Sequence, residues 1–194
     1  MRRSRHEVAG AGAAVAGGAM WAVKGAVILA VGDQPPLLFE VAGLLFPLAL
    51  VGLHHRLSGG GGRPGQIGGL LARLAGLGAL ATAAYGGLVR EPSDVLLGAL
   101  IALTALSTFI GLLLLGLAAR STEALPERWR NLPAAMGIAA IPAIMVGGVL
   151  EAIHERLLEV PIVVLGIGWA LLGVVLLAPH ADERRGAGTP AGLR

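Results

Sequence analysis

The chain has 194 residues, of which 55% are hydrophobic and only 14% are charged. A soluble domain has about a quarter of its residues charged, so this composition excludes an ordinary soluble protein. The net charge of +3 does not indicate nucleic-acid binding, because the arginines lie at the ends of apolar runs and not together on one surface. The lack of cysteine excludes disulfides, thiolate metal sites and cysteine catalysis.

The apolar residues form six runs, each of about the 17–25 residues that cross a bilayer. The runs lack the alternation of a membrane barrel, and open strands cannot satisfy their backbone in lipid, so helices are expected. The sequence therefore predicts an all-α polytopic membrane protein with one membrane domain over residues 8–178, a basic cytoplasmic segment 1–7 before it and a disordered cytoplasmic tail 179–194 after it. The predicted spans are 8–32, 36–53, 67–89, 95–118, 132–150 and 160–178.

The arginines predict the orientation of these spans. With both termini in the cytoplasm, Arg90 and Arg156 are the two arginines of the outer side, against twelve on the inner side. Such an excess is typical of cytoplasmic loops and favours three in–out–in hairpins in a cell membrane, most simply the bacterial cytoplasmic membrane. The inner arginines are Arg2, Arg3, Arg5, Arg56, Arg63, Arg73, Arg120, Arg128, Arg130, Arg184, Arg185 and Arg194.

The first run carries Lys24, the residue that most suggests function. An alternative interpretation of this run as a cleaved signal peptide is disfavoured by its length and by the lysine. Lys24 lies eight residues before Gly32, about 12 Å below the outer surface at helical rise. A lysine at that depth needs a partner or a water-filled cavity. Glu40, early in the second run and at a similar depth, is the expected partner, and the pair with Trp21 forms the predicted ligand-binding pocket open to the outside. A pair that only fixes the hairpin remains the alternative.

The fourth run contains a polar stripe. Thr104, Ser107 and Thr108 recur at helical spacing, so their hydroxyls are expected to face inward and bond to carbonyls or to a neighbouring helix. Small residues also recur every four positions in several runs, as in the series Gly10, Ala14, Gly18, which predicts close helix packing.

After the fifth run, Glu151, His154 and Glu155 project from one helical face, together with Glu159. Glu-x-x-His spacing occurs in carboxylate-bridged metal sites, which gives a weak metal hypothesis, although a solvated helix end explains the same residues more simply. The remaining histidines are His6, His54, His55 and His180, all near predicted inner ends, where a solvated interfacial role is the simplest.

No catalytic motif is found in the sequence, and no cofactor is expected. The preferred hypothesis is a small transport, channel or ligand-sensing protein that uses the Lys24–Glu40 region. The alternative is a non-catalytic membrane subunit or scaffold that packs on a partner, or on a second copy, through its glycine- and alanine-rich helix faces. A membrane enzyme with its site at the acidic outer rim is the third and weakest hypothesis.

Overall fold

The computed structural model describes residues 4–33, 35, 38–57, 61–91, 93–122 and 124–178, and these ranges contain helices and no strand. Six of the helices are long, and two short 3-10 helices (η1, Glu127–Trp129, and η2, Glu155–Leu158) precede α5 and α6. The long helices are α1 (Arg5–Val31), α2 (Leu38–Arg56), α3 (Gly62–Leu88), α4 (Asp94–Arg120), α5 (Leu132–Ile153) and α6 (Glu159–Leu176).

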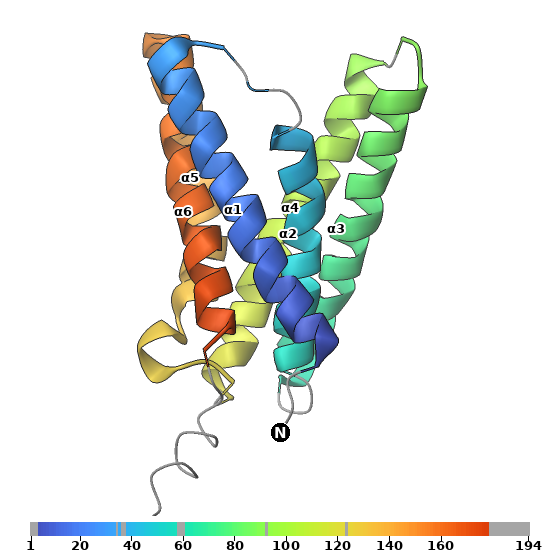
Figure 1. Ribbon diagram of the computed structural model, residues 1–194. Coiled ribbons are helices and arrows are strands. Elements are labelled where there is room, and N and C mark those ends of the chain that lie inside the picture. Colours follow the sequence, from blue (N-terminus) through green and yellow to red (C-terminus); the bar gives the residue numbers. More distant parts are fainter. Residues whose placement is uncertain are drawn as a thin grey trace, which may run out of the picture.

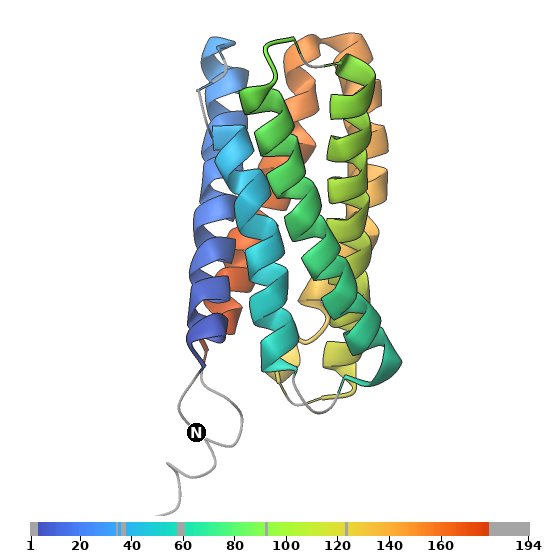
Figure 2. The same ribbon diagram turned by 90° about the vertical axis from the view of Figure 1, so that its right-hand side faces the viewer.

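Consecutive long helices run in opposite directions (Figures 1 and 2). Each helix packs on the next one in the chain, and α1 packs most extensively on α6, so the six helices form a closed ring. We call the end of the bundle where α1 begins the Arg5 end, and the opposite end the Val31 end.

Five of the long helices have the length and apolar composition needed to cross a membrane. The exception is α2, whose described apolar part, Val41–Arg56, is shorter. Many large apolar side chains on the outside of the bundle are exposed, such as Leu77 and Met145. An exposed apolar surface of this extent suits lipid as the surrounding medium.

The helices begin and end a few residues away from the predicted spans. α3 starts at Gly62, five residues before the predicted start at Ile67, and α1 starts at Arg5. The early start of α1 is explained by Ser4 as its N-cap: the Ser4 hydroxyl accepts the N–H of Glu7 (3.2 Å) and donates to the Glu7 carboxylate (3.0 Å). A helix ends where its caps lie, and hydropathy alone does not reveal caps.

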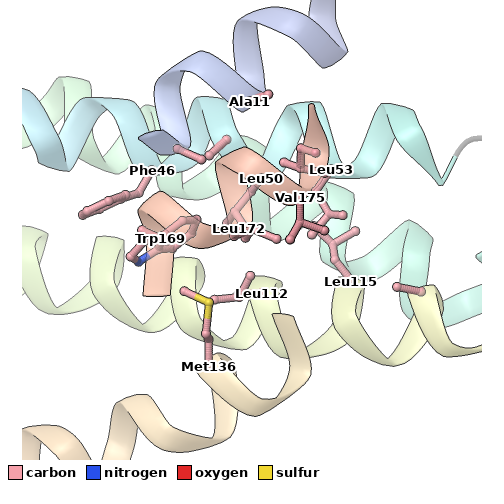
Figure 3. Close-up of a cluster of buried hydrophobic side chains, with 14 of the residues drawn as sticks. Ala11, Phe46, Leu50, Leu53, Leu112, Leu115, Met136, Trp169, Leu172 and Val175 are labelled. Atoms are coloured by element: carbon pink, nitrogen blue, oxygen red, sulfur yellow. The ribbon is translucent and has the colours of Figure 1, made fainter. Parts of the chain in front are cut away.

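The main core lies nearer the Arg5 end, where all six long helices contribute side chains (Figure 3). At its centre Trp169 is 0% exposed and stacks on Phe46, with ring centroids 4.6 Å apart. Leu50, Leu112 and Leu172 pack around them and are also fully buried. Rings and branched side chains from α2, α4 and α6 thus interlock at the centre of the ring.

Glycine permits the closest helix crossings. A Cβ on Gly10 of α1 would lie 2.5 Å from the Cα of Gly52 in α2, nearer than real side-chain atoms approach. Farther along α1, a Cβ on Gly18 would collide with the backbone of Gly166 and Ala170 in α6. The backbones of α1 and its two neighbours are therefore in direct contact, as small residues allow in membrane bundles.

The α3–α4 hairpin is covered by the rest of the bundle only near the Arg5 end. No described residue in the range 80–106 is buried, whereas Gly78 and Ala79 before it and Ser107 and Thr108 after it are. Figure 1 shows the ribbons of this hairpin diverging from α1 and α6 toward the Val31 end. Within this stretch, Tyr85 accepts the backbone N–H of Ser93 (2.9 Å), which closes the hairpin turn.

Candidate functional site

A buried ion pair joins α1 to α6. The Lys24 ammonium donates to both carboxylate oxygens of Glu159, at 2.9 and 3.1 Å. Lys24 is 4% exposed and Glu159 is 6% exposed, so both charges are removed from the solvent. Burial of two charges is costly, and the contact of the ammonium with both oxygens offsets part of that cost.

The packing of α1 on α6 brings the two charges together. Gly25, next to Lys24, has no side chain to hold α6 away: a Cβ there would lie 2.6 Å from Val163 Cγ2 and 3.2 Å from the Glu159 carbonyl oxygen. The Gly18–Gly166 crossing lies two turns earlier in α1. Because the backbones touch along this length, the Lys24 side chain is long enough to reach the Glu159 carboxylate.

Glu159 occupies the first turn of α6, where the N-terminal end of the helix dipole favours a carboxylate. The segment before it is fixed by His154, which ends α5 in an extended conformation and accepts the backbone N–H of Arg156 (3.3 Å). The 3-10 helix η2 then leads directly into α6. The short connection between α5 and α6 therefore determines where the carboxylate stands.

Arg156 from the same connection lies against the end of α1. Gly32 ends α1 with a φ of 91°, a conformation in which a side chain is strained, and a Cβ there would be 2.7 Å from Arg156 Cζ. A guanidinium beside the C-terminal end of a helix is favourable, because the carbonyls there carry partial negative charge. Arg156 thus contacts the end of α1, and Glu159, one turn later in the chain, contacts Lys24 about two turns before that end.

The sequence pointed to Lys24 but not to Glu159 as its partner. Glu159 was grouped with the acidic residues after the fifth run, 135 residues away from Lys24. Glu40 lies in the first turn of α2, and its side chain falls outside the described part of the chain, so the predicted Lys24–Glu40 pair stays a prediction. Glu159 directly precedes an apolar run and therefore lies as close to the membrane as Glu40. This position could have identified it as a candidate partner of Lys24.

Trp21, the third predicted ligand-binding residue, lies one turn before Lys24 on α1 and is partly buried. Its ring packs edge-on against Phe46, with centroids 4.8 Å apart and planes at 84°. Phe46 in turn stacks on Trp169. Trp21, Phe46 and Trp169 thus form one continuous aromatic cluster, which begins one turn before Lys24 on α1.

The residues of the metal hypothesis do not form a metal-ligating group. Within the described ranges no three His, Asp or Glu side chains are arranged to hold an ion. Glu151 and Glu155 are exposed, and His154 uses its ring nitrogen to cap η2. Glu159 is turned away from them toward Lys24. Of the three predicted ligands, His154 has the described structural role, as the cap of η2.

Two hydroxyls of the polar stripe of α4 bond to carbonyls of the same helix. Ser107 and Thr108 are buried, and the Thr108 hydroxyl donates to the carbonyl of Thr104 (2.8 Å). Thr104 donates to Leu100 (2.8 Å) in the same way and fills the space beside Gly78, where a Cβ would lie 2.5 Å from its hydroxyl oxygen. Both threonines thus satisfy their hydroxyls within α4, as is common in membrane helices.

A second polar group, which the sequence did not reveal, closes the Arg5 end. Arg56, at the end of α2, is 5% exposed, and its guanidinium donates to backbone carbonyls of three residues. They are Ala124 (2.7 Å) in the α4–α5 connection and Leu176 and Ala178 (2.9 Å) at the end of α6. The guanidinium carries five N–H donors in a rigid planar group, which suits contact with several carbonyls. In the sequence Arg56 was evidence only for topology, and these hydrogen bonds were not predicted.

Histidines from two helices stack at the same end. The rings of His6 in α1 and His55 in α2 are 4.8 Å apart and nearly parallel at 18°, and His54 lies 5.9 Å from His55. Nδ1 of His54 is 3.1 Å from the carbonyl oxygen of Gly65 in α3. His180, the remaining histidine that the sequence places at the inner ends, lies outside the described residues.

Comparison of the chain with protein-family models, with curated proteins and with solved structures finds no match. The function must therefore be argued from the geometry.

Proposed function

We propose that the chain crosses a bacterial cytoplasmic membrane six times, with both termini in the cytoplasm. The length of α2 is compatible with a sixth span, because its 19 residues extend for about 28 Å at 1.5 Å per residue, close to the roughly 30 Å of the hydrocarbon layer. The twelve-to-two distribution of arginines supports the orientation. The Arg5 end then faces the cytoplasm, and the Val31 end faces outward.

Within this topology, we propose that the protein binds or transports a small charged ligand at an outer polar site controlled by Lys24. The observation that carries the proposal is the buried Lys24–Glu159 pair between α1 and α6. Apolar side chains of similar size often replace a buried ion pair without loss of stability. Charges retained inside a membrane bundle are therefore functional candidates.

The pair suggests how such a site works. A ligand anion competes with Glu159 for the Lys24 ammonium, and a ligand cation competes with Lys24 for the carboxylate. Either exchange breaks the contact between α1 and the start of α6, while the glycine crossing at Gly18 and Gly166 remains as a pivot. Glu40 and Trp21 belong to the same site in this proposal, and the aromatic rings below it block passage in the closed state.

A chemical test exploits the fact that Lys24 is the only lysine of the chain. Full-length protein in sealed vesicles is treated at pH 8 with a membrane-impermeant amine-reactive acetylating reagent, and Lys24 modification is followed by mass spectrometry. We expect acetylation from the outer side much faster than global unfolding, measured in parallel by tryptophan fluorescence. The matched variant Glu159→Gln, which loses the ionic partner, should react faster still.

Acetylation of Lys24 only at the rate of global unfolding would overturn this proposal, because it would mean that the pair opens only when the protein unfolds. Labelling solely from the inner side would contradict the outward orientation of the site. A control peptide with free lysine, reconstituted in the same vesicles, verifies the activity of the reagent on each side.

One observation favours the alternative function, a non-catalytic subunit or scaffold. Residues 80–106 of the α3–α4 hairpin contain no buried side chain among those described, and a Cβ on Gly87 or Gly98 would meet nothing within 4 Å. Gly78 and Gly147 are unsuitable for contact with a partner, because they pack against Thr104 and against Leu158 of the same chain. Co-purification of a membrane partner, lost in Gly98→Phe but not in Gly12→Ala, would support this alternative.

A further inference from the structure

The stacked histidines lie where three helices meet. His6 belongs to the first turn of α1, His54 and His55 to the last turn of α2, and the carbonyl of Gly65 to the first turns of α3. The His54 ring also occupies the space at Gly69 of α3, where a Cβ would lie 2.5 Å from Nδ1. The three imidazole rings therefore connect α1, α2 and α3 at the Arg5 end.

This contact adjoins the closest crossing of α1 and α2. Gly10 lies one turn after His6, and a Cβ on Gly52 would be 2.6 Å from the Cα of Gly10 and 3.2 Å from the carbonyl oxygen of His6. The stacked rings therefore lie directly beside the closest approach of the two backbones. A change in the attraction between the rings therefore acts directly on the α1–α2 crossing.

We propose that the histidines His6, His54 and His55 form a proton-sensitive contact that holds the Arg5 end of α1 on α2 while the rings are neutral and releases it when they are protonated. His6 is exposed and His55 is only partly buried, so protons reach the rings from the aqueous phase. Neutral imidazoles stack favourably, whereas two imidazolium ions at this separation repel each other.

The charged groups around His55 favour the neutral ring. Burial lowers its pKa most, followed by the neighbouring His6 and His54 and by Arg73 of α3, while Glu7 of α1 acts in the opposite direction. His55 lies in the last turn of α2, beyond residue 53, where the sequence predicts the second span to end. Arg56 is directed to the carbonyls at the end of α6.

The sign of the pH effect follows from this lowered pKa. The folded state binds fewer protons at His55 than the unfolded state, so the contact is fully stabilising above the ordinary histidine pKa of about 6.5. Its stabilisation is lost as the pH falls below that value toward the lowered folded pKa. Acidification of the compartment at the Arg5 end is thus the signal that loosens α1.

The absence of cysteine allows a clean distance measurement. Spin labels are attached to Val8→Cys in α1 and Ile67→Cys in α3, both about half exposed at 48% and 50%, on the full chain in nanodiscs. Pulsed electron paramagnetic resonance then gives the distance between them at pH 8, 7, 6 and 5. We expect a longer distance to appear below pH 6.5, to be absent in His55→Gln, and to persist in His154→Gln, an exposed histidine at the other end.

The proposal is overturned if the distance is the same at pH 8 and pH 5, or if His55→Gln shows the same lengthening as the parent. Should His55→Gln fail to fold, His6→Gln removes the exposed ring of the stack and is expected to abolish the lengthening in the same way. The drop in melting temperature between pH 8 and pH 5 serves as the second measurement, and it should shrink in His6→Gln.

Discussion

Replacement of Lys24 by methionine tests the energetics of the buried pair. It leaves the Glu159 carboxylate without the ammonium that contacts its oxygens at 2.9 and 3.1 Å. At an effective dielectric constant near 20, charges this close attract by about 6 kcal/mol, which the cost of desolvation partly cancels. Because the two side chains are only 6% and 8% exposed, little is lost to solvent screening. We expect Lys24→Met and Glu159→Gln each to lower the unfolding free energy by about 3–5 kcal/mol.

The double variant should be much less destabilised than the sum of the two single variants, because it removes both charges of the Lys24–Glu159 pair together. Unfolding is followed in detergent micelles by denaturant titration with intrinsic tryptophan fluorescence. Glu155→Gln is the matched control, since it removes an exposed carboxylate four residues before Glu159 and should change the unfolding free energy by less than about 0.5 kcal/mol.

Additive effects of the two single variants would refute the reasoning, because additivity means that the residues do not interact. Single variants as stable as the parent would show that the charges contribute nothing to folding. A strong coupling would establish the pair as part of the folding energy, and the acetylation of Lys24 would then decide separately whether the pair also opens.

Three substitutions test the packing and the closure of the Arg5 end. Gly10→Ala should destabilise the protein, because the new Cβ would collide with Gly52. Gly12 has open space around it, so Gly12→Ala should stabilise the protein by about 0.5–1 kcal/mol through helix propensity. Unfolding curves of the two variants, recorded in parallel, measure both effects. Arg56→Met leaves three backbone carbonyls without their charged donor, so it should lower the unfolding free energy by about 3–5 kcal/mol. Arg63 is exposed, and Arg63→Met is the control that should leave the unfolding free energy unchanged.

Hydropathy was sufficient for the number and approximate place of the long helices. Their ends depended on local chemistry that an apolar count does not contain. Ser4, as the N-cap, extends α1 toward its start through its bonds with Glu7, and His154 ends α5 before the 3-10 turn. The capping pattern Ser-x-x-Glu was present in the sequence and could have been used.

Of the two residues in the ion pair, only Lys24 could be identified from the sequence. Lys24 stands out in any apolar run, because an isolated charge there is costly. Its partner depends on which helix closes the ring against α1, and that choice is made by the fit of Gly18 and Gly25 on α6. Spacing within one run carries no information on such a pairing. For the same reason the contacts of Arg56 with the end of α6 could not be predicted.

The pairing of the first helix with the last has a consequence during biosynthesis. A ribosome that adds roughly 5–20 residues per second needs about 7–27 s to pass from Lys24 to Glu159, a separation of 135 residues. For that time α1 must reside in the membrane with a charge whose Glu159 partner has not yet been made. The newly inserted helix therefore depends on shelter from the insertion machinery, or on a provisional contact within the nascent chain, until α6 arrives and the ring closes.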